Sequence, residues 1–366
     1  MTKWSNVALL LLVVIQSNMP ASARISTRLL KNKEEREVTP RILSVGDSLR
    51  WQHECGRWKR VNASRQAVEK MMNAEPAVDG EFPSAVALML HRADGSLAIP
   101  NPYCSGTLIS QRHIITAAHC FLIDADDFCA RSGRQIDLYA FGLYFKVHFA
   151  VTDVGHPSKI RPIRINKAFV PSDFNICEFT VHGVPKYDIA IGELAEDLPP
   201  EAFANGTVAA SCLGWPQRMR DARAREFDTF GYGYDPDRQY RREKEVMAIL
   251  QKGRAYQGEQ CDILPGDCIC IKEVNTISCK GDSGGPLLVQ DFDEYKGHEA
   301  RDHVVAVLSH GTSCDSIRWR QQQAHGGKYT LLDKYLEEHW LCEHTGLACD
   351  PVLWKMCYQT IVSPRY

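Results

Sequence analysis

The sequence predicts a mainly β-stranded protein, and two features of residues 77–341 support this fold class. Short runs rich in β-forming residues recur there, at 84–90, 106–109, 113–116, 137–145 and 304–309. Gly, Pro, Asn and Asp separate these runs, and many short strands with turn signals are typical of an all-β barrel or sandwich. With 366 residues, 44% of them hydrophobic, the chain is long enough for one large domain or two packed subdomains.

The first 23 residues have the order of a secretory signal peptide. Lys3 precedes an apolar run at 7–15, and small residues follow at 21–23. The run is far shorter than the roughly 20 residues of a membrane-spanning helix. We therefore expect a signal peptide at 1–23 and a secreted, extracellular protein; the alternative is a buried N-terminal helix.

The two flanks of the β-rich region differ from it in composition. Residues 24–70 are polar and charged, which predicts a leader with little core of its own, in part helical. Apolar residues at helical spacing predict one helix over 331–340 that closes the domain. The expected organisation is a signal peptide at 1–23, a leader at 24–70, the main domain at 71–341 and a cysteine-containing extension at 342–366.

The charge balance excludes few partners. A net charge of −2 provides no basic field that would attract nucleic acid or a membrane surface. Two N-glycosylation sequons, which begin at Asn62 and Asn205, would be glycosylated in the secretory pathway.

Fourteen cysteines fit an extracellular protein, because disulfides form and persist in oxidising compartments. Zinc is disfavoured, since Cys268 and Cys270 are too close for a zinc knuckle and no paired C-x₂-C units occur. Asp124, Asp126 and Asp127 lack the other ligands of an EF-hand loop and are interpreted as a solvated turn. We expect no cofactor and no metal.

Three segments indicate nucleophilic catalysis. They are T-A-A-H-C at 116–120, D-I-A-I at 188–191 and C-K-G-D-S-G-G-P at 279–286. Alone, the first two fit a packed core histidine and an ordinary strand. A serine hydroxyl needs an imidazole to take its proton, and the imidazole needs a carboxylate to fix its tautomer. Backbone N–H groups of Gly281 and Ser283, in a glycine-rich turn, can stabilise the developing oxyanion.

These segments, in the order His, Asp, Ser, resemble the trypsin/chymotrypsin family of serine peptidases over roughly residues 71–340. The resemblance implies a double six-stranded antiparallel β-barrel with a C-terminal helix and the reactive groups between the barrels. It implies that His119 is the general base, Asp188 its orienting carboxylate and Ser283 the nucleophile of a secreted endopeptidase. The extra cysteines and the long leader resemble divergent trypsin-like proteins of nematodes.

The resemblance also implies partners and disulfides. Expected partners are protein or peptide substrates, an activating protease and protein inhibitors, and the enzyme is expected to be a monomer. The implied pairs are Cys104–Cys120, Cys279–Cys314, Cys261–Cys270, with Cys268 as a competitor, and Cys55–Cys212, which would join the leader to the domain. The pairing of six cysteines stays open: Cys129, Cys177, Cys268, Cys342, Cys349 and Cys357.

The family's zymogen activation implies a new α-amino group that pairs with the aspartate before the nucleophile, here Asp282. Counting back from the segment at 77–83 places this terminus at Met71, after Lys70. The segment reads M-M-N-A at 71–74, where the family favours Ile-Val-Gly-Gly.

Specificity residues follow by position in the family. Ile277 stands where a trypsin carries the aspartate that binds Lys or Arg, so the preference is not expected to be tryptic. Ser278, Gly311 and Gly327 would keep the walls of the pocket small, which predicts a shallow apolar pocket. His310 replaces the family's usual tryptophan on the strand that pairs with substrate.

Three alternatives to this prediction differ in what the sequence would have to contain. A secreted, catalytically weak or inactive homologue that acts as a binding protein is the main one, given the departures at Met71, Ile277 and His310. An unrelated disulfide-stapled interaction module would need the three motifs to arise by chance. A serine esterase with a G-x-S-x-G elbow would have the chain order Ser, Asp, His, which is not found here.

Overall fold

The structure is a computed structural model that describes residues 25–31, 39–57, 75–123, 136–137, 139, 142–156, 158–176, 185–215, 226–233, 248–258, 267–273, 278–292, 300–311 and 327–349. Among these residues, no helix has the length and apolar character needed to span a membrane.

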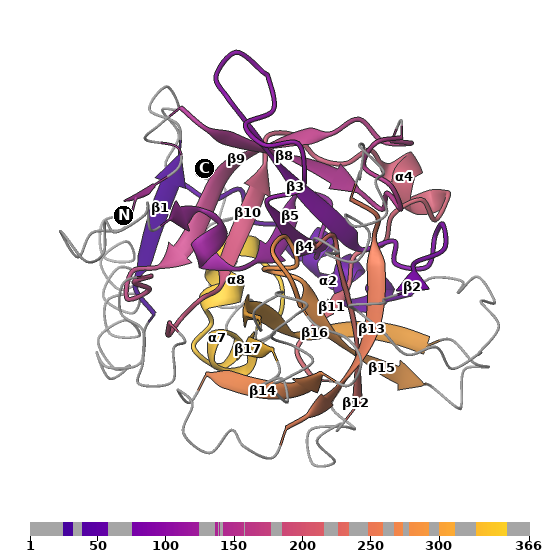
Figure 1. The fold of residues 1–366 in the computed structure, drawn as a ribbon. Helices are drawn as coiled ribbons and strands as arrows, with labels where there is room; N and C mark the ends of the chain where they lie inside the picture. Colours follow the sequence, from indigo (N-terminus) through magenta and orange to yellow (C-terminus); the bar gives the residue numbers. More distant parts are fainter. Residues whose placement is uncertain are drawn as a thin grey trace, which may run out of the picture.

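Six strands of the first half form a closed antiparallel barrel (Figure 1). The barrel closes because β9 pairs with both β10 and β8. The strands are β3 (Ala85–His91), β4 (Cys104–Leu108), β5 (His113–Thr116), β8 (Tyr144–Phe149), β9 (Ile163–Pro171) and β10 (Ala190–Leu194).

A second closed antiparallel barrel follows, drawn mainly in orange in Figure 1. It closes where β16 pairs with both β15 and β17. Its strands are β12 (Glu226–Gly231), β13 (Gln251–Gln257), β14 (Cys268–Glu273), β15 (Pro286–Phe292), β16 (Ala300–His310) and β17 (Lys328–Leu331). Shorter strands are β2 (Glu75–Pro76), which pairs with β13, β11 (Cys212–Leu213), which is parallel to β16, and β6 (Leu122–Ile123) with β7 (Ile136–Asp137). The predicted double six-stranded barrel is confirmed.

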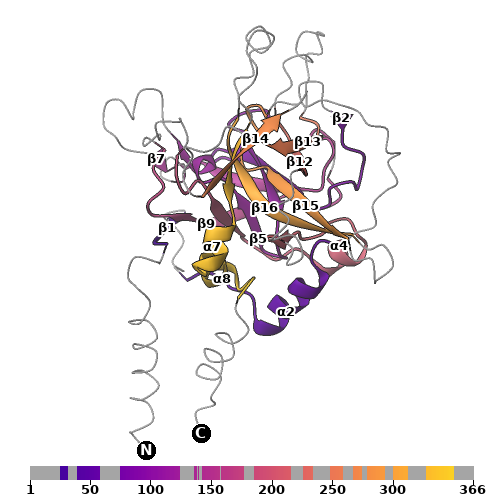
Figure 2. The ribbon, with the colours of Figure 1, turned by 90° about the horizontal axis from the view of Figure 1, so that it is seen from below.

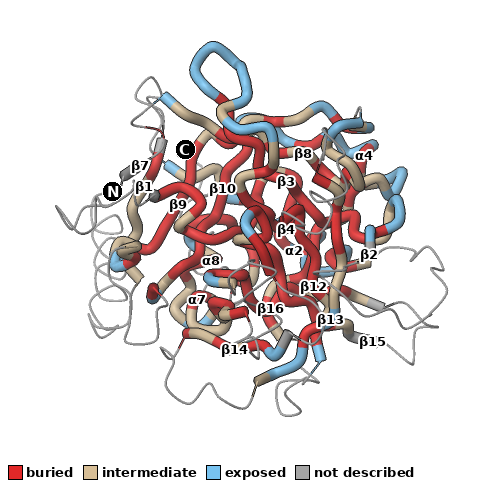
Figure 3. The backbone as a smooth tube through the Cα atoms, in the orientation of Figure 1, coloured by how far each residue is buried: buried red, intermediate tan, exposed pale blue. Residues whose placement is uncertain are grey.

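Strand periodicity explains how each barrel fills its interior. In β8 the side chains of Phe145, Val147 and Phe149 are buried, while the intervening residues are partly exposed. Successive side chains of a strand point to opposite faces, so every second residue of β8 reaches the barrel core. Figure 3 shows the buried residues concentrated along the strands of both barrels.

The sequence located four of the five predicted strand runs to within a few residues, and β3, β4, β5 and β16 correspond to them. The run at 137–145 is wrong as a single strand. Residues Ile136–Asp137 form β7, whereas β8 begins only at Tyr144.

The leader packs against the body of the protein, contrary to the expectation that it has little core of its own. Its residues Thr27–Lys31 form β1, a seventh strand antiparallel to β9. Its helix α2 (Val45–Glu54) is capped by Ser44, whose hydroxyl accepts a hydrogen bond from the Asp47 N–H. The helix lies near α4 (Pro200–Ala204) in Figure 2. Trp51 of α2 is buried, and its ring centroid lies 4.8 Å from that of Phe203.

Two short helices, α7 (Asp333–Glu337) and α8 (Trp340–Thr345), replace the single helix predicted over 331–340. They are separated by His339, which has a left-handed φ of 60°. A helix cannot continue through a residue in that conformation, so the chain changes direction. Packing continues past the boundary placed at 341, since Leu347 and Cys349 are buried and Cys349 forms a disulfide with Cys342.

Candidate active site

His119 and Asp188 form a close pair at the junction of the two barrels. His119 lies in a short 3₁₀ turn, Ala118–Cys120, directly after β5, and Asp188 lies two residues before β10. The Nδ1 atom of His119 is 2.7 Å from Oδ2 of Asp188, and the backbone N–H of His119 donates to Oδ1 at 2.9 Å. Because β5 and β10 are adjacent antiparallel strands, residues far apart in the sequence meet here.

The environment of this pair controls the charge of His119. Burial lowers the pKa of His119, but the charge of Asp188 and its hydrogen bond to the ring outweigh that effect and raise the pKa above its usual value. The carboxylate of Asp188 has no exposed side-chain surface, and its Oδ2 also accepts a hydrogen bond from the Ser309 hydroxyl at 2.6 Å. Ser309 belongs to β16, so both barrels hold Asp188.

The residue before Asp188 has an unusual backbone. Tyr187 has a left-handed φ of 60°, and its N–H donates to Oδ2 of the buried Asp267 at 3.0 Å. The same oxygen accepts a hydrogen bond from Tyr335 at 3.0 Å, and Lys334 donates to the Tyr187 hydroxyl at 3.1 Å. Neither Asp267 nor Lys334 belongs to a motif, so sequence reasoning missed this support.

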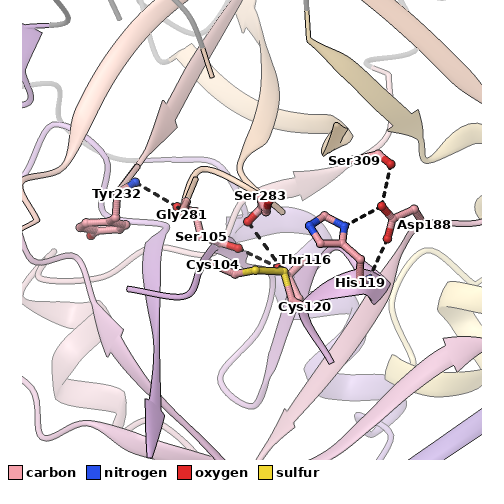
Figure 4. Close-up of a disulfide and its surroundings, with 10 residues drawn as sticks. All are labelled: Cys104, Ser105, Thr116, His119, Cys120, Asp188, Tyr232, Gly281, Ser283 and Ser309. Atoms are coloured by element: carbon pink, nitrogen blue, oxygen red, sulfur yellow. Dashed lines mark hydrogen bonds and ion pairs between the residues drawn. A yellow bond between two sulfur atoms is a disulfide. The ribbon is translucent and has the colours of Figure 1, made fainter. Parts of the chain in front are cut away.

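Ser283 lies in a tight turn before β15. Its side chain faces the second ring nitrogen of His119, on the side of the imidazole opposite Asp188 (Figure 4). The turn is closed by hydrogen bonds from the Asp282 N–H to Cys279 at 3.0 Å and from the Gly285 N–H to Asp282 at 2.8 Å. Gly284 has φ 79°, and a Cβ there would lie only 2.0 Å from the Thr116 hydroxyl oxygen, so this close approach requires glycine.

The N–H groups of Gly281 and Ser283 have no hydrogen-bond acceptor within the described residues. Two free donors beside a serine hydroxyl can bind an oxygen atom that develops negative charge. The structure therefore brings together the four residues that sequence reasoning placed in the reaction: His119, Asp188, Gly281 and Ser283.

Ser105 of β4 links this turn to the first barrel. Its N–H donates to the Ser283 carbonyl at 2.8 Å, and its hydroxyl donates to the Gly281 carbonyl at 2.8 Å. Ser105 was not among the predicted site residues. In the sequence, only its position directly after Cys104 could have indicated that it lies at the site.

Asp282 is buried at 6% exposure, and its carboxylate contacts the backbone of the second barrel and of its own turn. Its two oxygens accept hydrogen bonds from the backbone N–H groups of Gly233, at 2.7 Å, and Cys279, at 2.8 Å. Burial raises the pKa of Asp282 to about 6, although these two hydrogen bonds lower it. Met71, its predicted partner, lies outside the described residues, and within them no cationic side chain forms an ion pair with Asp282.

Of the residues predicted to line the specificity pocket, Ile277 lies outside the described part of the chain. Ser278 is buried, and a Cβ at Gly311 would lie 2.6 Å from the Ser278 carbonyl oxygen, so these two backbones are in direct contact. Gly327 accepts a hydrogen bond from the Ile271 N–H at 2.8 Å. His310, at the end of β16, is exposed and is the register partner of Lys328 on β17.

The disulfides can be compared with the pairs that the resemblance implies. The structure joins Cys104 to Cys120, beside His119, and joins Cys55 of the leader to Cys212, which are two of the pairs that the resemblance implies. Cys270 and Cys279 are also disulfide-bonded, whereas Cys268 is a free thiol and so does not compete for a partner. Cys261 and Cys314 lie outside the described residues.

Two further predictions have only partial structural counterparts. Asn205 is exposed at the C-terminal end of α4, whereas Asn62 lies outside the described residues, as do Asp124, Asp126 and Asp127. The ring of His119 lies near Cys104 and Cys120, but both sulfurs are in the disulfide and offer no thiolate to a metal.

Comparison with known proteins agrees with the geometry. A family model described as Trypsin matches residues 71–321. The venom serine protease Bi-VSP of Bombus ignitus is 26% identical over 318 residues, which cover 84% of this chain and 76% of that protein. The trypsin-like protease try-5 of Caenorhabditis elegans is 24% identical over 262 residues, which cover 63% of this chain and 74% of that protein. The venom serine protease of Polistes dominula is 25% identical over 256 residues, which cover 68% of this chain and 77% of that protein.

The match extends over strands of both barrels, up to and including β16, and includes His119, Asp188 and Ser283. The specific resemblance to divergent nematode proteins stays a prediction, since insect and nematode relatives match at similar identity. This chain belongs to the trypsin family of serine proteases.

Proposed function

We propose that the protein is a secreted serine endopeptidase, made as a zymogen, that cleaves peptide bonds through an acyl-enzyme formed on Ser283. The observation that carries the proposal is the geometry of one imidazole. His119 is hydrogen-bonded to a buried carboxylate through Nδ1, and its other nitrogen faces Ser283.

The proposed reaction uses each of these groups in turn. His119 takes the Ser283 proton as the hydroxyl attacks the substrate carbonyl, and Asp188 stabilises the imidazolium that forms. The N–H groups of Gly281 and Ser283 bind the oxyanion, an interaction typically worth about 2.7–4 kcal/mol per donor. His119 then returns the proton to the leaving amine, the acyl-enzyme forms, and water releases the product by the reverse sequence.

Zymogen control is supported by the state of Asp282. A buried carboxylate without a cation is costly, and burial raises the pKa of Asp282 to about 6. An α-amino group created at Met71 would offset this cost by pairing with Asp282. Sequencing the N-terminus of the active form tests the site of cleavage, and any start other than Met71 would rule it out.

We further propose an apolar, non-tryptic preference at the specificity pocket. The proposal rests on Ile277 in the sequence and on the contact between Gly311 and Ser278, which leaves little room beside the backbone. A peptide panel should show faster cleavage after medium-sized apolar residues than after Lys or Arg. Fastest cleavage after Lys or Arg would reject this preference.

The central test is labelling with a fluorophosphonate, which reacts with activated serines. We would compare the uncut protein, the protein nicked by trypsin, and a nicked Ser283→Ala variant. Labelling that appears on nicking and is lost in the variant would establish a zymogen with a working nucleophile. A Ser84→Ala variant, which removes a buried serine hydroxyl outside the site, should label like the wild type.

A catalytically inactive binding protein is the alternative, favoured by His310 at the position of the family's tryptophan. It predicts that folded, correctly nicked protein remains unlabelled by the fluorophosphonate. Secretion, proposed for either function, is supported by the structural disulfides, which persist in oxidising compartments. Detection of the protein in culture medium, with residues 1–23 removed, tests it.

A further inference from the structure

We propose that Ser105 is a positioning residue whose hydroxyl holds the oxyanion-binding turn in its reactive conformation. The inference rests on the proposed serine endopeptidase activity. Ser105 lies in β4, the strand that carries Cys104, and has no exposed surface. It contacts the turn at Gly281 and at Ser283, the two residues whose N–H groups face the reaction (Figure 4).

Ser105 makes two hydrogen bonds to the turn and one to Tyr232. The Ser105 hydroxyl donates to the Gly281 carbonyl at 2.8 Å and accepts from the Tyr232 N–H at 2.9 Å. The Ser105 N–H donates to the Ser283 carbonyl at 2.8 Å. The hydroxyl uses its one proton on Gly281, so the direction of the bond is fixed.

The turn depends on such an anchor because Gly281 has no side chain. Its φ of 99° is accessible to glycine, and a residue without a Cβ has little steric resistance to rotation of its peptide groups. The hydrogen bond from Ser105 fixes the carbonyl oxygen of Gly281. The opposite end of that peptide is fixed by the Asp282 N–H, which donates to the Cys279 carbonyl at 3.0 Å.

The second oxyanion donor is held in the same way. The Ser283 carbonyl accepts from the Ser105 N–H, and the other end of the same peptide group, the Gly284 N–H, donates to the Leu308 carbonyl at 2.8 Å. With both flanking peptides anchored, the Gly281 and Ser283 N–H groups keep a common direction. Preorganised donors act on the transition state because no reorganisation is needed when charge develops.

Ser105 also joins the two barrels at this point. The turn belongs to the second barrel, while β4 belongs to the first and is connected through Cys104–Cys120 to the turn that carries His119. One short path therefore fixes the oxyanion donors relative to the proposed general base. A misplacement of about 1 Å can cost roughly 100-fold in rate, so this link has kinetic consequences.

Replacement of Ser105 by alanine tests this positioning role. Ser105→Ala leaves the Gly281 carbonyl and the Tyr232 N–H buried without a hydrogen-bond partner. Rotation of the peptide group that contains the Gly281 carbonyl would let that oxygen find another partner. The same rotation would turn the Gly281 N–H away from the substrate. We expect kcat for a peptide ester substrate to fall at least tenfold, with KM changed less than threefold. The apparent pKa of His119 from the pH profile of kcat/KM should not change, since the His119–Asp188 pair is untouched.

Tyr232→Phe is the matched control. It also removes one buried hydroxyl that donates to a carbonyl, that of Val151 at 2.6 Å, and it leaves the Ser105 contacts in place. Both variants should melt at lower temperature than the wild type, but only Ser105→Ala should lose kcat. Equal kcat in the two variants would overturn the inference.

A second readout keeps the inference separate from the activity itself. Amide hydrogen exchange of the peptide that contains residues 281–283 should be faster in Ser105→Ala than in the wild type, and unchanged in Tyr232→Phe. This difference is expected even if nicked wild-type protein fails to react with fluorophosphonate, which would reject the proposed function alone. Unchanged exchange in Ser105→Ala would reject the role of Ser105 whatever the activity.

Discussion

Two buried carboxylate sites in this protein are stabilised in different ways. Glu193, at the end of β10, has no exposed surface and lies beside two cations, with Oε1 3.0 Å from the Arg41 Nε and 3.6 Å from the Lys167 ammonium. Asp188 and Asp267, between the barrels, instead accept hydrogen bonds from His119, Ser309, Tyr187 and Tyr335. At the first site cationic side chains stabilise the carboxylate, whereas at the second site hydrogen-bond donors mainly do so.

The two sites differ in what their negative charge acts on. Arg41 belongs to the leader and also donates its backbone N–H to Oε2 of Glu193 at 2.7 Å, and Lys167 donates to the carbonyl of Thr39 at 2.8 Å. The cationic site therefore fixes the leader to the first barrel, in addition to the disulfide Cys55–Cys212. Near Asp188 the uncompensated negative charge acts on His119, whose pKa it raises.

The largest expected effect concerns Asp188. Asp188→Asn should reduce the rate constant for fluorophosphonate labelling of the nicked protein by about 10⁴-fold, because the imidazole loses its orienting carboxylate. The wild-type rate should fall as the pH decreases through the raised pKa of His119. In the variant this inflection should move to lower pH, since burial remains and the charge is gone.

The control for this prediction is the unfolding free energy, measured in urea. Asp188→Asn should have only a small effect on the free energy of unfolding, since the amide oxygen still accepts hydrogen bonds, while the labelling rate constant falls strongly. A rate within tenfold of the wild type would mean that Asp188 does not orient His119.

Glu193 should show the opposite behaviour. Glu193→Ala leaves Lys167, at 1% exposure, as a buried charge without its carboxylate, and the loss of one member of a buried pair typically costs about 3–5 kcal/mol. The free energy of unfolding, measured in urea without reductant, should fall by this amount. The labelling rate of the remaining folded protein should change little.

Glu81→Ala is the matched control for this change. The Glu81 carboxylate is 2.6 Å from the Lys252 ammonium, but both side chains are partly exposed, so its loss should cost about 1 kcal/mol or less. Equal losses in the two variants would mean that burial does not distinguish the Glu193 site.

Asp282 gives an intermediate, pH-dependent effect. Its folded pKa of about 6 exceeds the usual 3.8, so the stabilisation from the protonated form is complete below pH 3.8 and is lost as the pH rises through 6. Asp282→Asn should remove this dependence, which for a pKa raised to about 6 amounts to up to about 3 kcal/mol between pH 3.8 and 7.5. The amide nitrogen cannot accept a hydrogen bond as the second carboxylate oxygen does, so the comparison with the wild type is of pH dependence and not of absolute stability.

After nicking, the same variant should lose fluorophosphonate labelling, because the new α-amino group has no carboxylate to pair with. Thermal unfolding of the uncut protein between pH 4 and 7.5 measures the first effect. A variant whose stability falls with rising pH as steeply as that of the wild type would contradict it.

The smallest expected effect concerns Asp267. Tyr187 has a left-handed backbone that costs roughly 1–2 kcal/mol, and its N–H is held by Asp267. Asp267→Ala should let this backbone relax, displace the adjacent Asp188 and lower the labelling rate about tenfold.

Tyr335→Phe serves as the control, because it removes the other hydrogen bond to Asp267 and keeps the one from Tyr187. Its labelling rate should stay within twofold of the wild type. Rates that fall equally in Asp267→Ala and Tyr335→Phe would show that Asp267 acts only through general stability.

The site was predictable where chemistry constrains the residue type within a short segment. The motifs around His119, Asp188 and Ser283 were readable because a proton acceptor, its carboxylate and a glycine-rich nucleophile turn need particular side chains at fixed spacing. The β-rich runs located four strands, since period-two burial and turn residues are local signals. The division of the run at 137–145 between β7 and β8 and the break at His339 were missed because neither has a comparable local signal.

The sequence by itself therefore predicted the fold class and, through the family resemblance, the segments of His119, Asp188 and Ser283 and two of the disulfides that the structure contains. The tertiary structure alone decided which buried polar groups support them: Ser105 beneath the oxyanion turn, Asp267 behind Tyr187, and Arg41 with Lys167 around Glu193. The packing of the leader against the barrels was likewise decided by the tertiary structure, although the leader is polar in composition. Its ion pair, strand and tryptophan find partners more than a hundred residues away, and such long-range contacts leave no local pattern in a single sequence.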